Sequence, residues 1–86
     1  MIAALARIAP LDGNRDYPEV ELRGQLWAQA GKDRRINHLR IRAGPAGFDI
    51  IAFVAADSPP AAHSILHGLV QELLVNDPRL RLWRVV

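Results

Sequence analysis

The stretch from Ile36 to Ala55, INHLRIRAGPAGFDIIAFVA, decides the fold. Its first part, Ile36 to Ala43, alternates apolar and polar side chains, and its last part, Phe48 to Ala55, is rich in Ile, Phe and Val. Both patterns are typical of β-strands. Between them lies Gly44 to Gly47, a glycine- and proline-containing connection of the kind that tight turns prefer. The stretch therefore predicts an antiparallel hairpin.

Beyond the hairpin, the sequence predicts a helix and then a strand. Asp57 or Ser58 is placed to cap a helix whose first turn contains prolines. The helix extends to about Val75 and is followed by Asn76-Asp77-Pro78, which stops it. The last segment, Leu80 to Val86, is predicted as a strand. The helix has one apolar stripe with helical spacing, made of Ala62, Ile65, Leu66, Leu69, Val70 and Leu73.

Before the hairpin, Ile2 to Ala9 alternates like a strand and ends in the polar loop Pro10 to Asp16. The next segment, Pro18 to Gly31, carries two patterns. A capping box starting at Asp16 and the run from Gln25 to Ala30 favour a helix. Residues 19 to 26 also alternate as a strand would. The helix is the preferred interpretation, with Trp27 in the core, and the strand stays open as an alternative.

The predicted order is strand, helix, strand, strand, helix, strand. This is the ferredoxin-like βαββαβ pattern, an α+β two-layer sandwich. We expect a four-stranded antiparallel sheet with both helices on one face, as a single domain over residues 1–86. The resemblance is to a fold and implies no particular function, because many unrelated functions share this fold.

The sheet face without helices is the candidate functional surface. Successive side chains of a strand point to opposite faces of the sheet. This alternation assigns to the helix side Ile2, Leu39, Ile41, Ile50, Ala52, Val54, Leu80 and Leu82. It assigns Leu5, Arg7, His38, Arg40, Arg42, Asp49, Ile51, Phe53, Arg81 and Trp83 to the open side. A small protein rarely leaves such an apolar group bare. We predict an interface built from Leu5, Arg7, Arg40, Arg42, Ile51, Phe53, Arg81 and Trp83.

Composition limits the possible functions. The 86 residues contain no cysteine, which excludes disulfides and thiol chemistry. The formal net charge is +2, short of the basic balance of a strong nucleic-acid binder. No apolar run approaches the roughly 20 residues of a membrane span, and no basic segment precedes an apolar one at the N-terminus. We expect a cytoplasmic protein without a membrane partner.

Catalytic and metal-binding patterns are weak. His63 and His67 share a helix edge at i, i+4, but no third ligand is evident, and zinc sites need three or four. Asp12 to Asp16 begins like a calcium loop, and the pattern then fails at Tyr17 and Arg23. The sequence predicts no cofactor and no metal site.

Function is therefore inferred from the open face. We expect a non-catalytic interaction or regulatory module that forms a homodimer through this face, or binds another protein there. Single-stranded RNA or DNA binding on the same face is an alternative, because an RNA-binding family of this topology stacks bases on sheet aromatics. A cofactor-free dimeric α/β-barrel enzyme is another, with His38, Asp49 and Trp83 as the nearest candidate residues.

Overall fold

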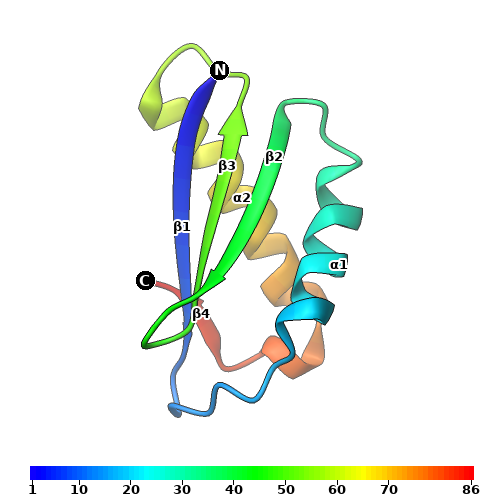
Figure 1. Ribbon diagram of the computed structural model, residues 1–86, viewed down its shortest axis with the longest axis vertical. Coiled ribbons are helices and arrows are strands. Elements are labelled where there is room, and N and C mark those ends of the chain that lie inside the picture. The colour runs from blue at the N-terminus through cyan, green and yellow to red at the C-terminus, as the bar shows by residue number, and fades with distance from the viewer.

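The computed structural model describes all residues, 1–86, as one four-stranded antiparallel sheet with two helices (Figure 1). The elements, in chain order, are β1 (Ile2–Pro10), α1 (Glu19–Ala30), β2 (Ile36–Ala43), β3 (Phe48–Val54), α2 (Pro59–Asn76), the 3₁₀-helix η1 (Pro78–Leu80) and β4 (Trp83–Val85). The strand order is β2-β3-β1-β4. The predicted α+β class and antiparallel hairpin are confirmed.

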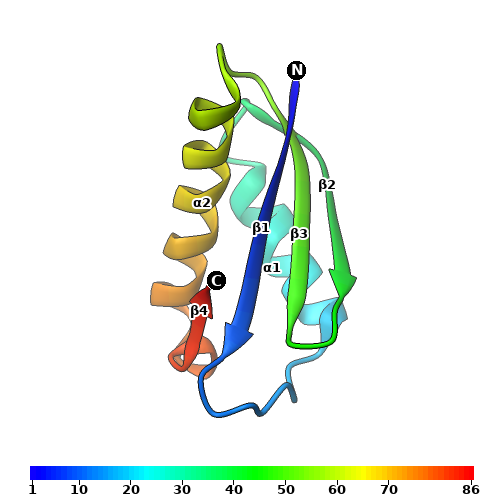
Figure 2. The same ribbon diagram turned by 90° about the vertical axis from the view of Figure 1, so that its left-hand side faces the viewer.

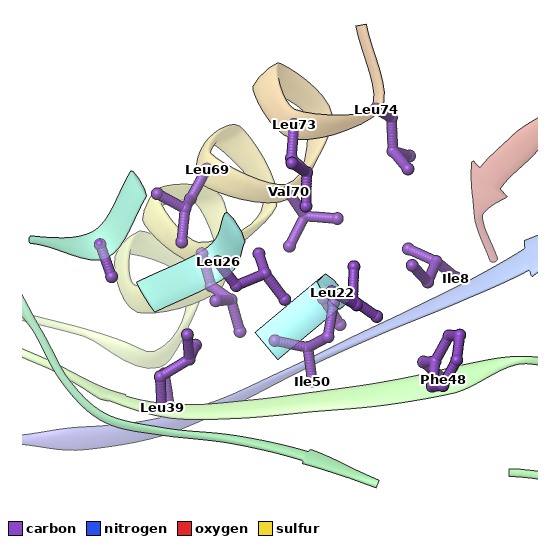
Figure 3. Packing of buried hydrophobic residues seen from close by; sticks show 14 of the residues in the cluster. Ile8, Leu22, Leu26, Leu39, Phe48, Ile50, Leu69, Val70, Leu73 and Leu74 are labelled. Atoms are coloured by element: carbon purple, nitrogen blue, oxygen red, sulfur yellow. The ribbon is translucent and has the colours of Figure 1, made fainter. Parts of the chain in front are cut away.

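The two layers meet at one hydrophobic core. Figure 3 shows Leu22 and Leu26 of α1 close to Leu39 and Ile50 of the sheet, with the α2 side chains packed beside them. Leu22, Leu26 and Ile50 are completely inaccessible to solvent. Burial of these side chains is the main force that holds helices this short in place, because isolated helices of 12 residues are marginal in water.

The segment with two possible interpretations is a helix. α1 buries Leu22, Leu26 and Ala30 at helical spacing. The predicted cap at Asp16 is wrong: Pro18 occupies the cap position, and no side chain caps the helix. The backbone N–H of Asp16 instead donates to the Asn14 side chain, because this loop forms local turns before the helix starts.

The last strand starts later than predicted, and this changes which side chains face outward. Asp77 and Pro78 begin η1, so β4 starts at Trp83 rather than at Leu80. Trp83 lies in the core, where its ring stacks on Phe48 with centroids 5.5 Å apart. The placement of Trp83 on the open face is therefore wrong.

The predicted positions of two residues next to Trp83 are also wrong. Leu82, predicted to face the helices, is exposed, and Arg81 follows η1 instead of lying in the sheet. Arg84 takes the outward position opposite Ala9 of β1. The cause is the 3₁₀ turn, which delays the start of the strand and so shifts its alternation.

A β-bulge at His38 shifts the alternation of β2 by one residue. Asn37 pairs with Phe53 and Arg40 with Ile51, so two residues of β2 lie opposite one residue of β3. His38 has φ 52°, a left-handed conformation that is uncommon outside glycine. The extra residue lets both Ile36 and Leu39 enter the core.

Figure 2 shows the helices on one side of the sheet, and no helix on the other side. One face of the sheet is thus free of helices, as the sequence predicted. Neither α1 nor α2 combines the length and the apolar character that a membrane crossing requires.

Candidate functional site

The centre of the open sheet face is apolar. Leu5 of β1 lies opposite Ile51 of β3, and Ala3 lies opposite Phe53, so all four side chains share one face. Leu5 is 39 % exposed and Phe53 is 43 % exposed. We call Ala3, Leu5, Ile51 and Phe53 the apolar patch.

An ion-pair ladder borders the apolar patch. Arg7 lies opposite Asp49, and Arg42 pairs with the same residue from β2. Arg7 Nε lies 3.2 Å from Asp49 Oδ1, and Arg42 Nη2 lies 3.5 Å from Oδ2. One carboxylate therefore pairs with two guanidinium groups, and the ladder carries a net charge of about +1. Because both arginines are largely exposed, each pair contributes little stability, about 0–1 kcal/mol.

Two further cations stand at the margins of this face. Arg40 lies opposite Ile51 at the β2 edge and forms no ion pair. Arg84, on β4, donates to the backbone carbonyls of Arg81 and Trp83 at 2.7 and 2.8 Å. Of the eight predicted interface residues, the structure brings six together on this face: Leu5, Arg7, Arg40, Arg42, Ile51 and Phe53. It adds Ala3 of β1 and Arg84 of β4. Arg84 was missed because the start of the strand after η1 was misplaced.

The candidate catalytic residues do not converge. His38 meets the ring of Phe53 edge to face at 5.9 Å, Asp49 is held between its two arginines, and Trp83 belongs to the core. A general acid or base needs to lie within hydrogen-bond reach of a common reacting group. These three side chains lie in three different environments, and so they form no single centre.

The histidine pair on α2 is a close contact between two rings. The His63 and His67 centroids are 3.8 Å apart. Partial burial lowers the pKa of His67, the neighbouring His63 lowers it further, and a hydrogen bond to the Leu5 backbone opposes the change. No group of three or more metal-ligating side chains occurs in the structure.

A partly buried polar cluster joins α1, and the loop before it, to the C-terminal end of α2. The Tyr17 hydroxyl donates to Asp77 Oδ2 at 2.7 Å, and Gln25 Nε2 donates to the same oxygen at 3.0 Å. The Arg79 guanidinium lies 4.9 Å from the Tyr17 ring centroid and also pairs with Glu21. We call these five residues the Tyr17–Asp77 cluster.

The cluster has a strong electrostatic signature. Burial alone would raise the pKa of Asp77, but hydrogen bonds from Tyr17, Gln25 and Arg79 outweigh it and lower the pKa to about 2. Burial raises the pKa of Tyr17 to about 12, helped by its hydrogen bond to Asp77. Asp77 also accepts from the backbone N–H of Arg79 and so caps η1, which starts at Pro78. These hydrogen bonds connect α1 to the end of α2, so the cluster stabilises the packing of the two helices.

The chain was compared with known proteins in three ways. No family model, curated protein or solved structure matches it. The residues described above are therefore the basis for any functional inference.

Proposed function

We propose that this chain is a small interaction or regulatory module without a catalytic centre, and that it self-associates through the open sheet face. The observation that carries the proposal is the apolar patch, three large side chains and an alanine set side by side on two central strands. Such a patch on a small protein marks an interaction site. A two-fold dimer lets the same patch serve both partners.

The arrangement of charge suits a second copy. Asp49 neutralises much of the charge of Arg7 and Arg42, so the region beside the apolar patch carries little repulsion. Arg40 and Arg84 stand at the margins, where solvent can still reach them. This is the anatomy of many interfaces, an apolar centre with a polar rim.

The size of the face is also adequate. A standard interface buries about 800 Å² of each partner. The molecule measures 36 × 21 × 19 Å along its principal axes, so an interface of that size would take up most of one side. A dimer would therefore use the whole open face, with the apolar patch and the ion-pair ladder both included.

The succession β-α-β-β-α-β and the strand order β2-β3-β1-β4 support a further part of the proposal, that the arrangement is ferredoxin-like. In that arrangement one sheet face is left free of helices. Nucleic-acid binding on this face has less support, because Phe53 is the one aromatic of β1, β3 and β4 that is exposed on it.

Charge insertion at the centre of the patch tests the proposal. Phe53→Arg places a guanidinium in the middle of the interface, and we expect it to convert a dimer into a monomer in sedimentation velocity. Val75→Arg is the matched control, because Val75 is 80 % exposed on α2, away from the sheet. We expect this control to keep the wild-type mass. A Phe53→Arg protein that folds by circular dichroism and still sediments as a dimer would contradict the proposal.

A further inference from the structure

The outer side of α1 exposes a tryptophan that the sequence analysis placed in the core. Trp27 is 49 % exposed, whereas the other tryptophan, Trp83, is 4 % exposed. Leu22, Leu26 and Ala30 occupy the buried positions of the helix, so Trp27 is not needed for packing. An indole is costly to leave in water, because it is one of the largest apolar side chains. Half of the ring is therefore accessible for a contact with something outside the chain.

Trp27 borders a groove between α1 and the β2 edge, the two elements that lie next to each other in Figure 1. The groove has a volume of about 430 Å³, within the range of roughly 300–1,000 Å³ that small-molecule sites occupy. Its lining consists of Arg23, Trp27, His38, Leu39, Arg40 and Ile41. No acidic residue contributes to this lining, and its two arginines give it a positive charge, which suits an anionic ligand.

The Trp27 ring and the two arginines of the groove have few contacts within the chain, so they can contact a ligand. No cation lies over the Trp27 ring, since the one cation–π contact of the chain joins Arg79 to Tyr17. Arg40 forms no ion pair, and Arg23 has only a loose, exposed contact with Glu19 at 3.6 Å. Exposed pairs of this kind are weak, so Arg23 can turn to a bound anion at little cost.

We propose that this groove binds single-stranded nucleic acid. One base stacks on the exposed face of Trp27, and the flanking phosphates contact Arg40 and Arg23. Stacking on an aromatic ring combined with arginine contacts to phosphate is the way proteins hold single strands without reading sequence. An acidic peptide would satisfy the arginines, but Asp and Glu side chains have no aromatic ring to stack on the indole.

This proposal is independent of the self-association proposal. Trp27 belongs to the helix layer, whereas the apolar patch lies on the opposite face of the sheet. Arg40, at the β2 edge, belongs to both surfaces, and His38 of the groove also contacts Phe53 of the apolar patch. Light scattering on the Arg40→Ala protein separates the two proposals, because it reports the mass independently of nucleic-acid binding.

The experiment is a titration of the full chain with a fluorescein-labelled ten-nucleotide oligo-dT, followed by anisotropy at low salt. Tryptophan emission is recorded in parallel with unlabelled oligo-dT. Because Trp83 is buried, quenching of the emission reports on Trp27. A ten-residue polyglutamate serves as the probe for non-specific binding of polyanions.

We expect oligo-dT to quench the emission and polyglutamate to leave it unchanged. Trp27→Ala should weaken oligo-dT binding about tenfold, since one stacked base contributes about 1–3 kcal/mol. Arg40→Ala should weaken it and reduce the slope of log affinity against log salt by about 0.7. Arg81→Ala is the matched control and should bind as wild type, because Arg81 is exposed and does not line the groove.

Three results would overturn the proposal. The first is the absence of a rise in oligo-dT anisotropy at low salt. The second is a folded Trp27→Ala protein that binds oligo-dT as tightly as wild type. The third is polyglutamate binding of equal strength with equal quenching, which would identify the groove as a site for acidic peptides instead.

Discussion

The two helices cover the same sheet but are held in different ways. α2 has 18 residues and buries six of them, and the Ser58 hydroxyl accepts from the Ala61 N–H at its start. α1 has 12 residues, buries three and has no side-chain cap. α1 also exposes Val20 and Trp27, whereas the large apolar side chains of α2 are mostly buried.

The difference indicates a division of roles. α2 contributes most of the helix surface buried in the core, so its sequence is constrained by packing. α1 is fixed by a narrow stripe and by the Tyr17–Asp77 cluster, which ties it to the end of α2. The outer side of α1 is therefore free to carry a binding surface.

The largest effect is expected in α2. Leu66 is completely buried, so Leu66→Ala removes a side chain from the core and should reduce the free energy of unfolding by about 3 kcal/mol. Urea denaturation measures the loss. Val75→Ala, on the exposed side of the same helix, should change stability by about 0.5 kcal/mol or less. Equal losses in the two variants would contradict the role assigned to α2.

An intermediate effect is expected where the helices are tied together. The pKa of Asp77 in the folded protein is about 2, below its ordinary value of 3.8. Ionised Asp77 thus stabilises the fold above about pH 4, and this contribution disappears as the pH falls from about 4 to 2. The contribution is on the order of 1–2 kcal/mol. Chemical denaturation at a series of pH values measures it.

Variants of the cluster sharpen the same test. Asp77→Asn should be less stable at neutral pH and should lose less stability between pH 4 and pH 2. Tyr17→Phe removes one donor to Asp77, so the pKa of Asp77 in the folded protein should rise toward 3.8. The acid loss should then be smaller than in the wild type and should be complete at a higher pH. If the wild type and Asp77→Asn show parallel pH profiles, the cluster does not fasten α1 as described.

The smallest effect is a gain of stability in α1. A Cβ on Gly24 would meet no atom within 4 Å, so Gly24→Ala should add about 0.5–1 kcal/mol by favouring the helix. Thermal unfolding measures the rise in Tm. Gly47→Ala is the contrast, because its Cβ would overlap the Ile8 carbonyl oxygen and should destabilise the protein. A lower Tm for Gly24→Ala would show that α1 tolerates less change than proposed.

Local patterns in the sequence were enough to predict much of this fold. The hairpin, the cap at Ser58 and the stripe of α2 each depend on residues close together in the chain, so periodicity and turn chemistry reveal them. For the same reason, the outward positions of Leu5, Ile51 and Phe53 could be predicted. Self-association through them stays a prediction.

The features that could not be predicted from the sequence depend on contacts between distant residues or on competing local preferences. Asp77 and Pro78 read as a helix stop, but the 3₁₀ turn they start moves Trp83 from the open face into the core. The Tyr17–Asp77 hydrogen bond joins residues 60 positions apart, which no local pattern reveals. Trp27 was misplaced because size and apolarity favour the core, whereas three smaller side chains already fill the buried stripe of α1.

The most direct test of self-association is the mass of the wild-type chain in solution. Size-exclusion chromatography with light scattering over a range of concentrations gives this mass without any substitution. A mass near twice 9.5 kDa, falling toward 9.5 kDa on dilution, is the result expected for a dimer through the open sheet face. A mass of 9.5 kDa at every concentration up to the millimolar range would contradict it.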